Sequence, residues 1–138
     1  MLHQQKLRFS TTGRGTYNIT QQIAETIEKS GIKNGICHIF IQHTSASLIL
    51  CENADTTVRE DLNVFMAKLV RDGDSAYKHK TEGPDDMAAH IRTVLTQSSL
   101  SIPVLKGKCD LGIWQGIFLW EHRTIPHKRN LAITIMGE

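Results

Sequence analysis

The sequence predicts an α+β protein in which a mainly antiparallel β-sandwich of about seven strands packs with two or three helices. Apolar residues recur with a period of two in the first segment and over about the last forty residues, which is typical of half-buried strands. Two stretches near the middle of the chain show instead the spacing of amphipathic helices. Because the chain has 138 residues, we expect a single domain over residues 1–138.

Composition and charge are those of an ordinary soluble domain. Hydrophobic residues make up 40% of the chain, charged residues 22%, and the formal net charge is +2. This balance gives nucleic-acid binding no support, and no apolar stretch has the length of a signal-peptide core or a membrane span. The three cysteines lack the spacing of a zinc site or of a disulfide framework. We therefore expect a cytoplasmic protein without nucleic-acid or membrane partners.

The N-terminal part of the chain predicts strands around one short helix. Leu7 and Phe9 alternate with polar residues and predict the first strand. Thr20 is placed to cap a short helix, and Gly31 stands where a glycine would end it. Between residues 36 and 51, two β-branched runs flank a polar stretch, which predicts two strands joined by a polar bend.

The middle of the chain predicts two helices separated by the longest loop, residues 71–83. Thr57 and Glu60 have the spacing of a capping box at the start of the first helix. Pro84 is placed to begin the second helix, which we expect to end near Gln97. The buried stripe of the first helix is predicted to be Val58, Leu62, Phe65, Met66 and Leu69. That of the second helix is predicted to be Met87, Ile91, Val94 and Leu95.

The C-terminal part returns to alternating residues. These predict strands over residues 100–105, 113–121 and 131–136, with a turn at 106–108. Since hairpins are the shortest way to join antiparallel strands, we expect consecutive strands to pair. Gln115 shares the apolar face of its strand, and a buried amide needs a ligand, a subunit contact or another polar partner.

Histidine is the outlying residue type, with seven in the chain. His43 ends a strand and shares the parity of its apolar residues, while His79 lies in the polar loop before the second long helix. His90 follows Asp86 by four residues on that helix, which places its imidazole beside a carboxylate. Three imidazoles that converge in the fold would suit Zn²⁺ or a similar metal, with one coordination position of the metal left open. Their spacing matches no local metal motif, and each alone is more typical of a structural or surface histidine.

Other side chains also suit catalysis. Glu52 directly follows an apolar strand and no cap explains it, so it is the preferred general base. The carboxylates of Asp55 and Asp86 suit the same role or metal binding, although both are also ordinary residues at helix starts. Ser45 lies close to His43 in sequence, but the GxSxG elbow of a serine nucleophile is missing.

Five short sequence blocks are spread along the whole chain. They are QHTSASL at 42–48, Glu52-Asn53 with Asp55, YKH at 77–79, GPDDM at 83–87 followed by Ala89-His90-Ile91, and WQGI at 114–117 followed by Glu121 and Arg123. In this order they resemble the YjbQ family, whose members are often named secondary thiamine-phosphate synthase. The resemblance implies an α+β homotrimer with a divalent metal at His43, His79 and His90.

The resemblance also implies an activity. A weak thiamine-phosphate synthase would join an aminopyrimidine diphosphate to a thiazole phosphate and release pyrophosphate. Glu52 and Asp55 would then bind metal or position substrate, and Arg123 would contact phosphate. The further residues of these blocks that we expect to bind substrate are Thr44, Ser45, Trp114 and Gln115.

Three functions stay open at this point. Pyrophosphate release usually needs Mg²⁺, which prefers oxygen ligands, whereas imidazoles favour Zn²⁺. The chain is accordingly a thiamine-phosphate synthase, another metal-dependent hydrolase with Glu52 or Asp86 as base, or a non-enzymatic trimer that binds a metal or small ligand. For both enzymes we expect a small phosphate-bearing substrate.

Overall fold

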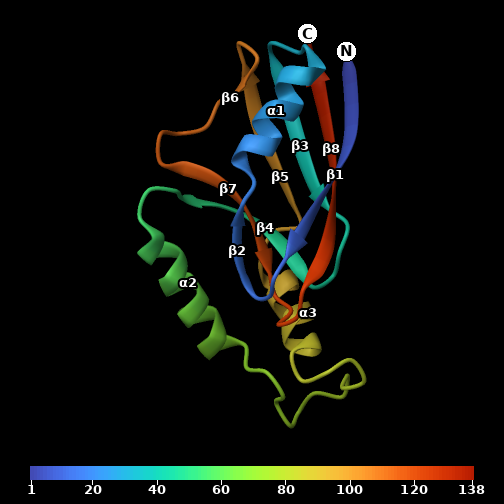
Figure 1. Cartoon of the computed structure of the whole chain (residues 1–138), viewed down its shortest axis with the longest axis vertical. Coiled ribbons are helices and arrows are strands. Elements are labelled where there is room, and N and C mark those ends of the chain that lie inside the picture. The colour runs from blue at the N-terminus through green and yellow to red at the C-terminus, as the bar shows by residue number, and fades with distance from the viewer.

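Two mainly antiparallel sheets and three helices make up the chain, which confirms the predicted α+β class (Figure 1). The computed structural model describes residues 1–138. The strands are β1 (Leu2–Thr11), β2 (Gly15–Asn18), β3 (Gly35–Ile41), β4 (Ala46–Glu52), β5 (Ser99–Leu105), β6 (Lys108–Cys109), β7 (Gln115–Glu121) and β8 (His127–Gly137). The helices are α1 (Thr20–Ser30), α2 (Thr56–Leu69) and α3 (Asp86–Leu95). None of them combines the length and the apolar character of a bilayer-spanning helix.

Most strands that follow one another in sequence do not pair, because they lie in different sheets. The larger sheet has the order β1-β8-β3-β5-β6, and the smaller sheet has the order β2-β7-β4. The first and last strands pair from Leu2 with Met136 to Thr11 with His127. Only β5 and β6 form a hairpin, so the prediction that consecutive strands pair is wrong. The bend after β3 shows the reason, because it sends the chain into the other sheet, where β4 pairs with β7.

The core lies between the two sheets and α1. Ile39 of β3 and Ile133 of β8 pair across the larger sheet, and both belong to the same buried cluster as Ile23 and Ile27 of α1. The alternation of buried residues is the period of two that predicted these strands. Gly31 ends α1 as expected, with a left-handed φ of 72° that residues with a side chain rarely adopt.

The first two helices start at other residues than predicted. The N-cap of α1 is Ile19, and the hydroxyl of Thr20 instead accepts the backbone N–H of Ile117 at 2.9 Å. The N-cap of α2 is Asp55, whose carboxylate accepts the N–H of Thr57 at 3.0 Å. A stronger acceptor two residues earlier thus takes the capping role that the sequence predicted for Thr57.

The apolar stripe of α2 is only partly buried, contrary to the prediction. Met66 packs beside Trp120 and is 7% exposed, whereas Phe65 is 62% and Leu69 58% exposed. Figure 1 shows α2 at one side of the molecule, extending past the smaller sheet. The sheet is therefore too short to cover the whole stripe.

In α3 the buried face differs from the predicted one. The helix begins at Asp86 rather than Pro84 and ends before Gln97, and Val94 is 83% exposed. Its buried residues are Asp86, Ala88, Ala89 and Arg92. Two alanines allow the helix to pack closely on β4, and both charged residues find polar partners on other elements. Of the predicted apolar stripe, Met87 and Ile91 are partly buried, whereas Val94 and Leu95 are exposed. The partners of the buried charged residues come from distant parts of the chain, which local periodicity does not predict.

Candidate metal centre

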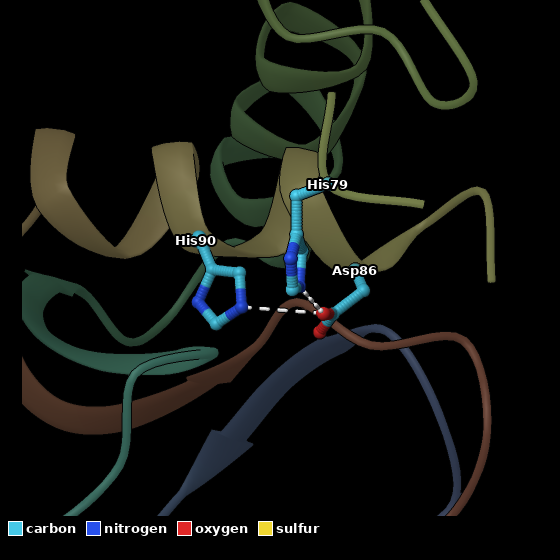
Figure 2. Close-up of side chains that lie close together, drawn as sticks. All are labelled: His79, Asp86 and His90. Carbon is cyan, nitrogen blue, oxygen red and sulfur yellow. Dashed lines mark hydrogen bonds and ion pairs between the residues drawn. The ribbon is translucent and has the colours of Figure 1, made fainter. Parts of the chain in front are cut away.

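Two imidazoles and one carboxylate converge at the start of α3 (Figure 2). Nε2 of His79 lies 2.7 Å from Oδ2 of Asp86, and Nε2 of His90 lies 3.2 Å from the same oxygen. The three ligand atoms all lie within 4.8 Å of one another. Two imidazole nitrogens and a carboxylate oxygen at this spacing could hold one divalent ion. His79, Asp86 and His90 form the candidate metal centre.

Local and tertiary structure both contribute to this arrangement. Asp86 and His90 are four residues apart, so one turn of α3 places them side by side. His79 comes from the loop between α2 and α3, which folds back over the start of α3 (Figure 2). The loop is closed at its base, where the N–H of Gly73 donates to the carbonyl of Pro84 at 2.8 Å.

A second hydrogen bond determines the tautomer of His90. Its Nδ1 lies 3.0 Å from the carbonyl oxygen of Thr44, which can only accept, so Nδ1 carries the proton. In the neutral ring, Nε2 then has a lone pair that faces the Asp86 carboxylate at 3.2 Å. Two such acceptors repel each other unless a proton or a metal cation lies between them. The donor set therefore fits a divalent metal, and the bond to Thr44 orients the ring as in histidine metal ligands.

A buried arginine holds the other oxygen of Asp86. Nη1 of Arg123 lies 3.0 Å from Oδ1 of Asp86, and its Nε lies 2.9 Å from Oδ2 of Asp85. Burial alone would raise the pKa of Asp86, but the hydrogen bond from His79 and the charges of His90 and Arg123 outweigh it. The pKa of Asp86 therefore lies below its usual value, and the carboxylate is ionised at neutral pH. Because Arg123 contacts two carboxylates, it positions Asp86. Its predicted contact with phosphate stays a prediction.

A cavity of about 320 Å³ opens beside His79. Tyr77, Lys80 and Pro84 line it together with this histidine. The side chain of His79 is 46% exposed and that of His90 is 31% exposed, so a small molecule can reach the centre. Lys80 adds a positive charge to the lining.

His43 lies outside the candidate metal centre. Its Nε2 accepts the backbone N–H of Asn130 at 2.7 Å, and its Nδ1 lies 3.3 Å from Nη1 of Arg129. Burial and the Arg129 charge lower the pKa of His43, which keeps the ring neutral. The lone pair that a metal would need is thus already used. The structure brings together two of the three predicted histidines and adds Asp86.

Next to His43 lies a buried ion pair that sequence reasoning missed. Nε of Arg129 donates to Oε1 of Glu121 at 2.8 Å, and Nη2 donates to the hydroxyl of Ser45 at 2.9 Å. Burial raises the pKa of Glu121, but hydrogen bonds from Arg129 and Thr11 reverse the shift and lower it. Ser45, predicted to bind substrate, is a buried acceptor in this network. The only sequence signal was the place of Glu121 on an apolar strand face.

The remaining candidates gather at the start of α2. Oε2 of Glu52 accepts two backbone N–H groups of the turn before α2, at 3.1 and 2.7 Å, so a turn does explain this residue. Asp55 caps α2. Gln115 is exposed and accepts the N–H of Gly112 at 2.7 Å, so the expectation of a buried amide is wrong, and Trp114 is 60% exposed. No hydrogen bond or ion pair joins these residues to the candidate metal centre.

Comparison with known proteins gives the family. The family model described as UPF0047 protein YjbQ-like matches residues 5–138. The chain belongs to this family. A UPF0047 protein of Synechocystis is 48% identical over 136 residues, covering 99% of this chain and 92% of that protein. The UPF0047 protein YjbQ of Escherichia coli O157:H7 is 40% identical over 139 residues and both chains are covered in full. The resemblance seen in the motifs is thus confirmed.

Solved UPF0047 structures share the fold. A crystal structure of a YbjQ-like protein of unknown function from Sulfolobus solfataricus P2 aligns with a TM-score of 0.86 at 28% identity, over the full length of both chains. A YjbQ/UPF0047 family protein from Clostridium acetobutylicum aligns with a TM-score of 0.87 at 32% identity, over 95% of this chain and 98% of that one. The likeness gives the fold, and the function has to be argued from the site.

Proposed function

We propose that this chain is a metal-dependent hydrolase of a small phosphate-bearing molecule, with a zinc-like ion held by His79, Asp86 and His90. The observation that carries the proposal is the convergence of their three ligand atoms within 4.8 Å. Such a mixed nitrogen and oxygen set suits Zn²⁺ and its neighbours better than Mg²⁺. When bound, this metal supplies a Lewis acid and lowers the pKa of water.

The protein itself orients the ligands and receives the substrate. The N–H of His90 Nδ1 on the Thr44 carbonyl keeps Nε2 aimed inward. Arg123 holds Asp86 by one oxygen and leaves the other to the centre. Lys80 lies in the lining of the cavity beside His79, where its charge complements a phosphate. A volume of about 320 Å³ corresponds to a small molecule.

Metal content and hydrolysis test this proposal. Wild-type protein loaded with Zn²⁺ and desalted should retain about one ion per chain and hydrolyse p-nitrophenyl phosphate. His90→Ala should lose both properties while its circular dichroism stays native. His38→Ala is the matched control, because this histidine lies on β3 and bonds only to the hydroxyl of Ser101. Equal zinc content in all three proteins, or none in the wild type, would overturn the proposal.

A second candidate is thiamine-phosphate synthase. It is supported by the cavity beside His79, because Tyr77 and Pro84, from two of the blocks that carry the family resemblance, both line it. The test is to mix the aminopyrimidine diphosphate, the thiazole phosphate and Mg²⁺ with metal-stripped protein and to measure released pyrophosphate. Release without transition metal favours the synthase, whereas no release together with zinc-dependent hydrolysis favours the hydrolase.

We also propose that the chain forms a homotrimer. The support is the exposed apolar surface of Phe65, Leu69 and Trp114, which a single chain leaves in water. The predicted catalytic role of Glu52 and the predicted substrate-binding roles of Asp55, Trp114 and Gln115 depend on this assembly. One chain makes no contact between them and its own candidate metal centre, so only a neighbouring copy would complete the site.

A further inference from the structure

A larger cavity lies between α1 and the β5–β6 hairpin, toward the end of the molecule opposite α3 (Figure 1). Its volume is about 610 Å³. Ala24, Cys109 and Leu111, all partly buried, form its apolar floor, and the fully buried Ile27 and Ile32 lie beneath them. This cavity is the α1 groove. It shares no lining residue with the cavity beside His79.

Three lysines surround the α1 groove without carboxylate partners. They are Lys33, Lys106 and Lys108. None takes part in an ion pair, although Glu25 and Glu28 of α1 line the same groove. Lys33 lies against the hairpin tip, since its Nζ is 3.4 Å from where a Cβ of Gly107 would stand. Three lysines against two glutamates leave the lining with a net positive charge, which favours an anionic ligand.

The hairpin tip carries a lysine in a costly conformation. Lys106 has a φ of 52° and is the only non-glycine residue of the chain with positive φ. Gly107 follows with a φ of 76°, which gives the two-residue turn that favours Asn-Gly. Asparagine would adopt this conformation more easily than lysine does. A strained backbone at a charged side chain points to a role for that charge.

We propose that the α1 groove binds a nucleoside phosphate. The lysines at the hairpin tip neutralise the phosphate, and the apolar floor of Ala24, Cys109 and Leu111 covers a flat ring. Glu25 and Glu28 accept hydrogen bonds from sugar hydroxyls or ring amines. Bare inorganic phosphate has no groups for the floor or for these carboxylates, so it binds more weakly than a nucleotide. This site is separate from the candidate metal centre and does not depend on the proposed hydrolase.

Calorimetric titration with ADP tests the groove. The double variant Lys106→Ala/Lys108→Ala should weaken ADP binding by about tenfold or more. Lys6→Ala is the matched control, because this exposed lysine of β1 also lacks an ion pair and lies outside the groove. His90→Ala should bind ADP like the wild type. Absence of ADP binding at millimolar concentration, or its loss in His90→Ala, would overturn the proposal.

Lys106→Asn separates binding from stability. The variant should raise Tm, because asparagine relieves the strained turn, and should weaken ADP binding. A lysine without a ligand would give the higher Tm with unchanged binding, which contradicts the proposal. The double variant Glu25→Gln/Glu28→Gln checks the nucleoside contacts. It should lower the preference for ADP over pyrophosphate, and an unchanged preference would also count against the nucleoside.

Discussion

α2 and α3 follow one another in the chain, and both have the sequence pattern of amphipathic helices. However, α2 exposes apolar side chains to solvent, whereas α3 buries charged ones. α2 leaves Phe65 and Leu69 more than half exposed, whereas α3 buries Asp86 at 2% and Arg92 at 3% exposure. The difference lies in their surroundings. α3 packs where the bend before β4, the segment after β7 and the loop before α3 supply charged and polar partners, while α2 extends past the small sheet. Periodicity therefore locates a helix but does not decide which face is buried.

Asp86→Asn should have the largest effect, because it removes a charge on which the buried face of α3 depends. Two imidazoles and Arg123 lose their ionised partner. We expect loss of zinc binding and a decrease in the free energy of unfolding of about 3 kcal/mol. Metal analysis and urea denaturation measure the two effects. Asp61→Asn, on the exposed side of α2, is the control, and a zinc-binding variant of native stability would refute the assigned role.

The exposed face of α2 gives the next prediction. The double variant Phe65→Ser/Leu69→Ser should convert a trimer into a monomer of 15.5 kDa, because it removes the apolar area that a second copy would cover. Light scattering after size exclusion measures the mass. Lys68→Ser, between these residues on the same helix, should leave the trimer intact. A wild-type protein that is already monomeric would contradict the assembly.

The buried His122 lies within reach of the charge of Arg92, which belongs to the buried face of α3, so the pH dependence of stability tests this region. Burial and the Arg92 charge lower the pKa of His122 to about 3, so the folded state keeps the ring neutral while the unfolded chain protonates it near pH 6.5. The stabilisation is therefore complete above pH 6.5 and is lost as pH falls toward about 3, by at most about 1.4 kcal/mol per pH unit. In His122→Gln this slope should become shallower, while His38→Gln should keep the wild-type slope. Parallel curves for all three proteins would rule out His122 as the group responsible.

Asp55→Ala gives the smallest effect and separates a cap from a substrate contact. Loss of the N-cap of α2 should cost about 1 kcal/mol of folding free energy. If Asp55 also binds substrate in the assembly, kcat/KM falls as well. Asp61→Ala is the control for a change of charge on the same helix. A variant as stable as the wild type would show that the cap contributes little.

The sequence by itself determined the local elements and the family. Alternating residues located β1, β5, β7 and β8 but not the short β2 and β6. Gly31 ended α1, and the four-residue spacing of Asp86 and His90 paired a carboxylate with an imidazole. These features depend on the direction of side chains within one strand or one helical turn. Spacing of this kind can be read from the sequence because residues two, three or four positions apart share a face of a strand or helix.

Only the tertiary structure decided which distant groups meet. It paired β1 with β8, brought His79 to Asp86, and gave the lone pair of His43 to a backbone amide. It also buried the polar face of α3 and left the apolar face of α2 exposed. Such contacts depend on the path of the whole chain between two sheets. No local pattern encodes that path, because it is set by the packing of many residues at once.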